Sequence, residues 1–489
     1  MPVLDPDHYL SLDAVAQAAG LRAGEFSTSD LVGAAIARAE QVNPGLNVFS
    51  SQRFTEASNE ASRNDADAES LQRSPLAGLP FLVKDLSALA GQPCEKGSRL
   101  YQGHVAAANS AIVQRFLDAG LVVLGKTNTP EFGLTLTTEP VSKGATRNPW
   151  DTGYSTGGSS GGAAAAVASG IVPAAHASDG GGSIRIPASC CGLFGLKPSR
   201  GLTIIEPSMR ACWSGMSVGL VVSRSVRDSA AYLDLLRTRK PILFPLPEAP
   251  ASFSIGLEQP AMALRIAVMT QHPLGETLHP QVRDAILGTA RLCEELGHQV
   301  QEIAPPIDFK PPANAMNNLI CLHTWQEVAA MAQARNLDLE TAELETSTRL
   351  MAQLGSELSA ADYAASLDVL AAAAQQMADF HQRYDMLLAP VLNRPTAELG
   401  WLDMNSDDIR EYVGRYREYS GYTALFNGTG QPAMSVPLGQ DSHGLPIGSQ
   451  FSAGWGQDAL LLRLARQLEQ ARPWPLLAPD YAPRAGTGN

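Results

Sequence analysis

Residues Gly157–Pro187 read GGSSGGAAAAVASGIVPAAHASDGGGSIRIP. Two glycine loops that carry serines, Gly157–Gly162 and Gly180–Ser183, flank the alanine-rich run Ala163–Ala168, which has high helix propensity. Glycine lets the backbone approach other groups closely, so successive N–H groups of the second loop can point at one centre. This pattern is typical of an oxyanion hole beside a nucleophilic hydroxyl. No Gly-Lys-Ser or Gly-Lys-Thr follows, so the phosphate-loop motif is absent.

The motifs around this stretch resemble the amidase signature family. The family pattern is a Gly-Gly-Ser-Ser-Gly-Gly loop, then Asp-x-Gly-Gly-Ser-Ile-Arg-x-Pro-Ala, then Cys-Gly and Lys-Pro. This chain has Gly157–Gly162, Asp179–Ala188, Cys191–Gly192 and Lys197–Pro198 in that order. The family's Gly-x-Pro-x-x-x-Lys-Asp segment is matched upstream by Gly78–Asp85.

The resemblance implies a Ser-Ser-Lys triad. By the family pattern Ser183 is the nucleophile, Ser159 is the serine that relays the proton, and Lys84 is the base. The resemblance also implies that the peptide bond before Ser159 is cis. Because only a neutral lysine can activate a serine, the pKa of Lys84 must fall from about 10.4 towards about 7–8. Burial acts in that direction.

The second glycine loop has an implied role for each of its residues. The resemblance makes Gly180, Gly181 and Gly182 the oxyanion hole, with Asp179 and Arg185 holding the loop in place. It implies a serine hydrolase that cleaves C–N bonds through an acyl-enzyme, without a cofactor. We expect no metal either, because the nine histidines show no His-Glu-x-x-His or similar ligand spacing.

We expect an α/β fold in which a central mixed, twisted sheet is covered by helices on both faces. The resemblance implies one amidase signature domain over residues 1–489. Its catalytic core is expected at about 75–235 and 385–475, with a mostly helical insertion at about 305–383. Strands predicted at Ser217–Val222 and Leu264–Met269 alternate with helices at Arg227–Arg237 and Pro280–Leu296, which is typical of α/β layers. The apolar strand Phe81–Val83 is expected to deliver Lys84.

Two further elements are predicted near the N-terminus and within the insertion. The hydroxyls of Ser27–Asp30 can cap a helix over Leu31–Val42, and Asn43–Gly45 is expected to end it. The alanine-rich stretch Pro311–Arg383 is expected to be largely helical.

Two alternative functions use the same residues. Gly157–Gly161 also fits Gly-x-Ser-x-Gly, the nucleophile elbow of α/β-hydrolases, but that elbow needs a buried strand before it. Arg147–Thr156 instead reads as a polar loop with proline and glycine. The family also includes the amidase subunit of the tRNA-dependent amidotransferase, which the acidic charge and the lack of a basic patch count against.

Composition limits the partners and the compartment. The formal net charge of −13 argues against nucleic acid or an anionic membrane as a partner. Six cysteines without a Cys-x-x-Cys pair are expected to be reduced and mostly buried. No signal peptide and no spanning apolar run is seen, so we expect a cytoplasmic protein that acts on a small-molecule amide. A homodimer is left open.

Several details resemble the branch of the 6-aminohexanoate cyclic-dimer hydrolases and aryl-acylamidases. They are Lys126–Glu131, Thr137–Pro140, Gly144–Trp150, His176 and Ile320–Cys321. Gly180 and Gly181 depart from that branch, which has alanines there, and much of 200–260 and 330–425 is unlike it. Cyclic, aryl and linear amides and carbamates therefore remain candidate substrates.

The substrate pocket is expected to be neutral and largely apolar. A substrate carboxylate near Lys84 would raise the pKa of that lysine and so block its function as a base. The expected pocket walls are the loop after Lys84, Thr135–Thr138, Ile205–Gly215 and an inserted helix. The candidate substrate-binding residues on them are Thr137, Met209, Trp213 and Cys321.

Overall fold

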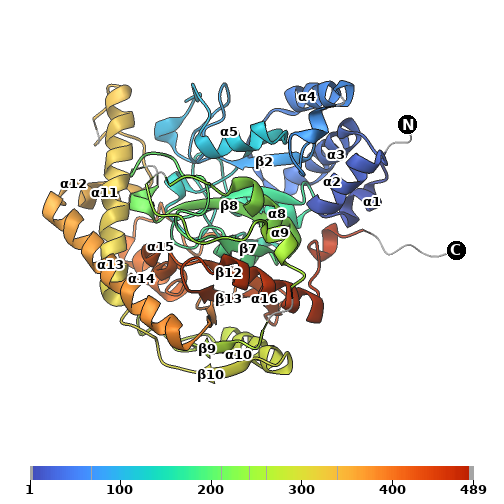
Figure 1. Ribbon diagram of the computed structural model, residues 1–489. Helices are drawn as coiled ribbons and strands as arrows, with labels where there is room; N and C mark the ends of the chain where they lie inside the picture. Colours follow the sequence, from blue (N-terminus) through green and yellow to red (C-terminus); the bar gives the residue numbers. More distant parts are fainter. Residues whose placement is uncertain are drawn as a thin grey trace.

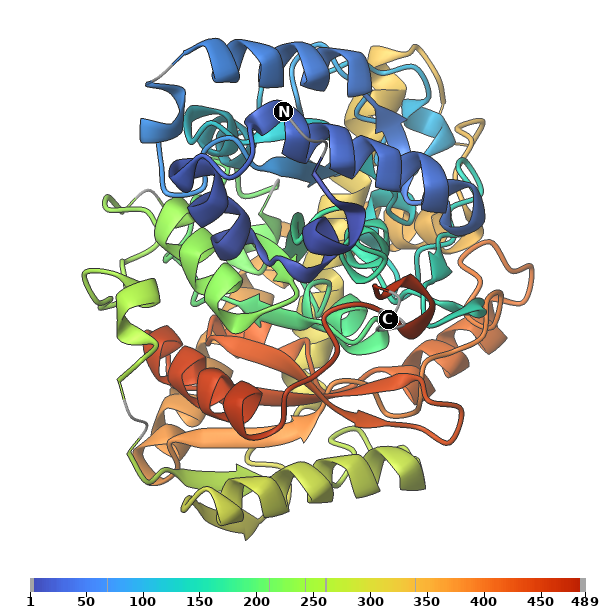
Figure 2. The ribbon, with the colours of Figure 1, turned by 90° about the vertical axis from the view of Figure 1, so that its right-hand side faces the viewer.

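The computed structural model describes residues 4–483 except for 68, 211, 242, 260, 261 and 339. Within these ranges one large and two smaller sheets lie among helices (Figure 1). The view turned by 90° shows the N-terminal helices at the top and, at the bottom, α10 beside β10, the edge strand of the large sheet (Figure 2). The fold is therefore α/β, as predicted.

The large sheet has eight strands in the order β10-β9-β11-β13-β12-β7-β8-β6. β9 is parallel to both of its neighbours, and the other pairs are antiparallel, so the sheet is mixed as predicted. β9 and β10 come from a segment between the two expected core ranges. The strands are β6 (Ala174–Asp179), β7 (Phe194–Lys197), β8 (Val218–Ser223), β9 (Arg265–Val268), β10 (Gln299–Glu302), β11 (Met386–Pro390), β12 (Ala433–Gln440) and β13 (Pro446–Ala453).

The remaining strands form two smaller sheets. The three-stranded sheet has the order β1-β3-β2, from β1 (Phe49–Gln52), β2 (Pro80–Lys84) and β3 (Val122–Thr127). β2 is parallel to β3 and is an edge strand. The strand that ends at Lys84 thus exists as predicted, but it belongs to a different sheet from the strand that leads to Ser183.

The third sheet pairs β4 (Arg147–Asn148) with β5 (Asp151–Ser155) where we expected a polar loop. β5 is exposed over its first three residues. It therefore does not supply the buried strand that a nucleophile elbow at Gly157–Gly161 would require.

Helices make up most of the rest of the described chain. The α-helices are α1 (Pro6–Ser11), α2 (Ala14–Ala23), α3 (Thr28–Leu46), α4 (Phe54–Ala66), α5 (Ala111–Asp118), α6 (Gly161–Ala168), α7 (Arg185–Cys190), α8 (Val226–Leu236), α9 (Phe253–Gly256), α10 (Pro280–Glu295), α11 (Lys310–Ala334), α12 (Thr346–Ser356), α13 (Ala360–Arg383), α14 (Ile409–Tyr419), α15 (Leu425–Thr429) and α16 (Asp458–Ala471). Short 3-10 helices lie at Ser70–Gln72, Arg99–Tyr101, Glu131–Gly133, Trp213–Gly215 and Pro479–Tyr481.

Side chains along β13 show that helices cover both faces of the large sheet, because neighbouring residues of a strand point to opposite faces. Gln450 accepts a hydrogen bond of 2.7 Å from Arg185 in α7. The hydroxyl of the next residue back, Ser449, lies 2.7 Å from the hydroxyl of Thr289 in α10.

The insertion consists of α11, α12 and α13, which confirms the helical prediction for Pro311–Arg383. These helices stand together at one side of the molecule (Figure 1, yellow to orange). No helix within the described ranges is both long and apolar enough to cross a membrane. All six cysteines are buried and unpaired.

The predicted end of the helix over Leu31–Val42 was wrong. α3 continues through Asn43–Gly45 to Leu46, with Pro44 inside its last turns. Proline removes one backbone donor and its ring crowds the carbonyl four residues back, and α3 continues for only two residues beyond Pro44. The helix stops at Asn47, whose backbone is left-handed with φ 54° and whose N–H donates to Asn43 O.

Helix α6 is the alanine-rich run of the sequence and is completely buried. Its first turn lies against the backbone of other segments. A Cβ atom added to Gly162 would lie 2.6 Å from Asn128 N, 2.7 Å from Asn128 O and 2.8 Å from Val48 O. Glycine is therefore required for packing at this position.

This contact predicts opposite effects for the same substitution in two helices. Gly162→Ala should destabilise the protein by about 1–3 kcal/mol, because backbone atoms cannot move aside and overpacking outweighs helix propensity. Gly33→Ala in α3, where nothing lies within 4 Å of the new Cβ, should stabilise it by up to about 1 kcal/mol. Denaturant midpoints of the two variants would check this. Equal shifts would contradict the packing argument.

Candidate active site

Lys84 ends β2, and its side chain is completely buried. Its Nζ lies 2.7 Å from Ser159 Oγ, 2.8 Å from Ser160 Oγ and 3.1 Å from Ser178 Oγ. The structure thus brings together Lys84 and Ser159, the two residues that the resemblance assigned as base and relay. Ser160 and Ser178 add two hydroxyls that the sequence analysis did not single out.

The surroundings of Lys84 favour its neutral form. Burial lowers the pKa of Lys84 to about 7, although the Asp179 carboxylate acts in the opposite direction. A neutral amine has two N–H donors and one lone pair. It can therefore donate to two of the three hydroxyls and accept from the third, which suits a base that takes a proton from Ser159.

The loop that carries Ser159 is packed closely against its neighbours. The peptide bond between Gly158 and Ser159 is cis, as the resemblance implied. A Cβ atom on Gly158 would lie 2.3 Å from Thr137 O, so only glycine fits there. Thr129 donates a hydrogen bond of 2.9 Å to Ser159 O.

Ser183 lies in the turn between β6 and α7, on the wall of a cavity of about 560 Å³. Ser159, Ser178 and Gly180 line the same cavity. In the described part of the chain no group makes a hydrogen bond with the Ser183 hydroxyl, and none joins it to Ser159. The two serines therefore open on one cavity, and the Ser183 hydroxyl is free to meet a ligand there.

Only some of the backbone N–H groups in the second glycine loop are hydrogen-bonded within the described part of the protein. The Gly182 N–H donates to Asp179 Oδ1 at 2.7 Å, so it is not available to an oxyanion in this structure. The N–H groups of Gly180, Gly181 and Ser183 have no partner among the described residues. Gly182 has φ 137°, and a Cβ there would lie 2.4 Å from Thr423 Oγ1. This position therefore requires glycine.

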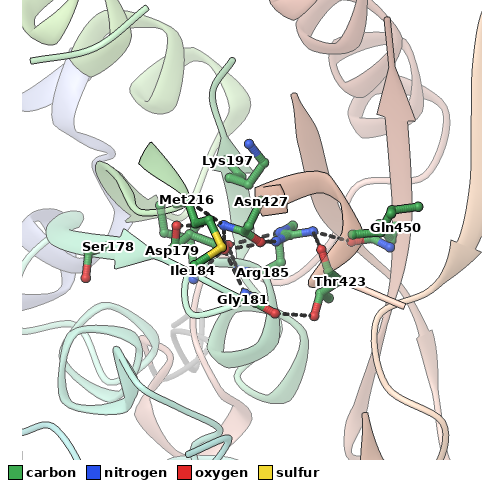
Figure 3. A network of polar contacts seen from close by, with 12 residues as sticks. Ser178, Asp179, Gly181, Ile184, Arg185, Lys197, Met216, Thr423, Asn427 and Gln450 are labelled. Atoms are coloured by element: carbon green, nitrogen blue, oxygen red, sulfur yellow. Dashed lines mark hydrogen bonds and ion pairs between the residues drawn. The ribbon is translucent and has the colours of Figure 1, made fainter. Parts of the chain in front are cut away.

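A buried ion pair holds this loop (Figure 3). Arg185 donates two hydrogen bonds of 2.9 Å to Asp179, from Nε and Nη2. Asn427 donates to Asp179 O at 2.8 Å and to Oδ1 at 2.9 Å. Arg185 also donates to Gln450 Oε1 at 2.7 Å and to Thr423 O at 2.8 Å. The network joins the loop to β13 and α15.

Asp179 is ionised within this network. Burial raises the pKa of Asp179, but the charge and hydrogen bonds of Arg185 outweigh burial and hold the pKa below its usual range. The carboxylate accepts from the N–H groups of Gly182 and Ile184 as well. Asp179 and Arg185 are the two residues predicted to hold the loop. Asp179 binds the backbone N–H groups of the loop, and Arg185 binds Asp179.

Of the four predicted substrate-binding residues, Trp213 lines the cavity and the other three do not. Thr137 is buried and donates to Leu402 O at 3.3 Å, and its backbone lies against the Ser159 loop. Cys321 is buried inside the helical insertion, and Met209 is 37% exposed to solvent. The placement of these three gives no support to a direct contact with substrate.

Three of the expected walls are nonetheless present. The loop after Lys84 contributes Leu86, Ile205–Gly215 contributes Trp213, and the inserted helix α11 contributes Glu327. Glu327 forms an ion pair with Lys96 and accepts a hydrogen bond from Tyr101. Thr135–Thr138 does not line the cavity in the described structure.

The sequence contained a signal for His176 and Ser178 on β6, which the analysis did not assign to the site. They alternate with Gly180, a predicted oxyanion-hole residue, and so share one face of the chain with it, whereas Asp179 lies on the other. All three line the cavity. By contrast, the pairing of Lys96 with Glu327 joins residues 231 positions apart and has no local signal.

A buried lysine surrounded by hydroxyls, beside a serine and free backbone N–H groups, forms a site suited to acyl transfer. The amidase family model matches residues 30–462. The chain therefore belongs to the amidase signature family and is an amidohydrolase that acts on C–N bonds other than peptide bonds.

Similar proteins match along nearly the whole chain. A putative amidase AmiC of Mycobacterium leprae (strain TN) is 39% identical and covers 95% of this chain and 96% of its own length. The structure of 6-aminohexanoate cyclic dimer hydrolase complexed with substrate has a TM-score of 0.88 at 34% identity, with 97% and 100% coverage. A bacterial aryl acylamidase has a TM-score of 0.86 at 27% identity, with 98% and 100% coverage.

The lowered pKa of Lys84 predicts the pH dependence of turnover. Below about 7 the amine is protonated and cannot accept a proton, so kcat/KM should rise with pH through about 7. Lys84→Ala should lose about 10²- to 10⁴-fold in rate and with it this limb of the profile. A p-nitroanilide substrate makes the measurement simple.

Lys197 offers a matched control, because burial also lowers its pKa to about 7 while its Nζ donates to Pro198 O at 2.9 Å, outside the serine cluster. The kcat/KM that remains in Lys197→Met should still rise with pH through about 7. Loss of the limb in this variant alone would assign the titration to Lys197 instead.

Proposed function

We propose that this protein hydrolyses uncharged amides through a Ser183–Ser159–Lys84 triad and an acyl-enzyme. The observation that carries the proposal is the contact of 2.7 Å between Lys84 Nζ and Ser159 Oγ on the cavity that Ser183 also lines. Burial brings the pKa of the lysine to about 7, so about half of the amine is neutral at pH 7 and can act as a base.

The proposed reaction has two halves. Ser183 Oγ attacks the amide carbon while its proton passes to Ser159, whose own proton passes to Lys84. The N–H groups of Gly180 and Gly181 stabilise the oxyanion. The proton then returns through Ser159 to the leaving nitrogen, the C–N bond breaks, and the acyl group stays on Ser183. Water, deprotonated along the same route, releases the acid and restores Ser183.

The charge of the cavity supports a neutral substrate. A carboxylate close to Lys84 would raise the pKa of that lysine and remove the base. Glu327, the acidic side chain of α11 in the wall, is neutralised by Lys96. Trp213, Leu86 and Met331 contribute apolar surface. We therefore propose cyclic, aryl or linear amides without charge near the scissile bond.

The alternatives use the same residues on other acyl groups. Aryl-acylamidase activity is supported by the similarity to the bacterial aryl acylamidase, and carbamate hydrolysis requires no different group. The role of amidase subunit in a tRNA-dependent amidotransferase is less well supported, because the net charge of −13 disfavours binding to RNA. We propose a small-molecule substrate and no nucleic-acid partner.

Covalent labelling tests the nucleophile. A fluorophosphonate or sulfonyl fluoride should label Ser183, and Ser183→Ala should abolish labelling and turnover together, because Ser183 Oγ is the atom that forms the covalent bond in the proposed reaction. Peptide mapping of the labelled protein identifies the residue. A label on Ser159 would instead favour the nucleophile-elbow mechanism.

A side-by-side panel tests the substrate class. We expect turnover of the 6-aminohexanoate cyclic dimer, a p-nitroanilide and an aryl carbamate to exceed that of glutamine, because glutamine carries a carboxylate near Lys84. Initial rates at equal enzyme concentration are sufficient. A preference for glutamine would contradict the neutral-substrate argument, and a p-nitroanilide or carbamate far ahead of the cyclic dimer would favour the aryl-acylamidase alternative.

A further inference from the structure

His176 is a buried titratable group that the proposed reaction does not use. It lies on β6, is 1% exposed and lines the cavity. Its ring contacts that of Phe116 edge to face, with centroids 5.5 Å apart. A buried polar side chain without a structural or functional partner is uncommon in proteins, so each of its two ring nitrogens needs an account.

The Nδ1 atom of His176 has a structural partner. The Asp85 N–H donates to Thr127 O in β3, so the preceding N–H, that of Lys84, points away from β3 at the free edge of β2. His176 Nδ1 accepts this N–H at 3.3 Å. The histidine therefore takes the place of a neighbouring strand for the residue that provides the base.

This contact determines the tautomer of the imidazole. A backbone N–H can only donate, so Nδ1 must accept, and in a neutral ring the proton is on Nε2. Burial, with the charges of Lys84 and Lys126 acting in the same direction, lowers the pKa of His176 to about 3. Nε2 is thus an N–H donor throughout the physiological pH range.

The Nε2 donor has no hydrogen-bond partner among the described residues, and His176 lines the cavity. On the neighbouring strand β8, an added Cβ at Gly219 would lie 3.7 Å from Nε2 and 2.5 Å from Ile112 Cδ1, so this side of the ring borders Ile112. The carboxylates of Asp85 and Asp179 bind Lys126 and Arg185 instead. An acceptor on a ligand in the cavity could therefore bind this donor.

The position of His176 on β6 places this donor away from the reacting bond. Gly180, Ser178 and His176 follow one face of the chain at every second residue. Four residues of extended chain span at most about 13 Å between the backbones of His176 and Gly180. The Nε2 atom lies nearer the turn than its own backbone does, because an added Cβ at Gly219, which pairs with Ser178, would be 3.7 Å from it. A substrate that extends along β6 from Ser183 would reach it.

We propose that the Nε2–H of His176 is a substrate-binding donor that recognises a second hydrogen-bond acceptor, such as a further amide carbonyl, several bonds from the scissile amide. The inference rests on the proposed amidase function and adds a specificity requirement to it. Amides with such an acceptor should be better substrates than hydrocarbon chains of equal length.

Matched substrates and two conservative variants test the donor. One pair differs on the acyl side, N-acetyl-6-aminohexanoyl p-nitroanilide against nonanoyl p-nitroanilide. The other differs on the amine side, N-(4-nitrobenzoyl)-6-acetamidohexylamine against N-(4-nitrobenzoyl)nonylamine. In at least one pair the wild type should favour the acceptor-bearing member in kcat/KM by about threefold to tenfold, the size expected of one neutral hydrogen bond.

The variants separate the two nitrogens. His176→Asn keeps an acceptor for the Lys84 N–H but lacks the Nε2 donor, so it should lose the preference while keeping the pH limb near 7. His176→Gln can place an N–H where Nε2 was, so it should retain the preference even if turnover of both members falls equally. His104→Asn, at another cavity histidine, which lies beside Tyr101, should leave the ratio unchanged.

Each outcome is decisive. A wild type that hydrolyses all four amides without preference, or a preference unaffected by His176→Asn, overturns the inference while the proposed function stands. A ratio that changes only in His104→Asn assigns the acceptor site elsewhere and overturns it too. If the wild type hydrolyses none of the four and Ser183 is not labelled, both proposals fail. Circular dichroism and thermal denaturation confirm that each variant is folded.

Discussion

The structure depends on keeping a lysine amine uncharged inside the protein. Lys84 is completely buried, and its Nζ makes hydrogen bonds only with hydroxyls among the described residues, so no contacting carboxylate compensates for the loss of water around an ammonium ion. At most positions in a protein, such burial of a lysine side chain would lower the stability of the fold. Here it sets the pKa near 7 and makes proton transfer from Ser159 possible. A hydroxyl environment satisfies the neutral amine without stabilising its charged form, which a carboxylate would do.

The Asp179 carboxylate lies close to the site, but its oxygens bind groups other than Lys84. Asp179 is near enough to raise the pKa of Lys84, yet its oxygens bind Arg185, Asn427 and the backbone of the glycine turn. Because the Asp179 carboxylate is shared among these donors, the turn keeps one conformation. The N–H groups of Gly180 and Ser183, two residues that line the cavity, have no internal acceptor among the described residues. The ion pair therefore acts on the loop and only weakly on the base.

Local motifs made much of this predictable. The glycine loops, the Lys84 strand and the Asp179–Arg185 segment carry short, specific patterns, and the structure places each where it can meet the others. Ser178 and His176 were also readable, because they alternate with Gly180 along a strand, but the analysis did not apply that period. The end of α3 was misjudged because Pro44 was treated as a stop signal rather than as a residue that one helical turn can absorb.

The pocket residues were predicted poorly for a physical reason. Which side of a helix faces a cavity depends on the packing of distant segments. Cys321 lies on the buried side of α11, whereas Glu327 on the same helix faces Lys96 and Tyr101. Thr137 was placed on the wall, but its neighbourhood is filled by the close approach of Gly158. The contacts of Glu327 join residues more than 200 positions apart and leave no short pattern in the sequence.

The division of the site between two sheets bears on how the protein reaches its active form. β2 brings Lys84 from the three-stranded sheet, while β6 leads to Ser183 from the eight-stranded sheet, and the Lys84–Ser159 contact spans 75 residues. The anchor of the turn to Gln450 spans 265. Contacts of such sequence separation form slowly, because the chain must lose much of its freedom before they do. In the unfolded chain Lys84 is an ordinary protonated amine. The base is thus created by the docking of the two sheets, and a chain with both sheets formed but not yet joined would have every residue of the site and none of its chemistry.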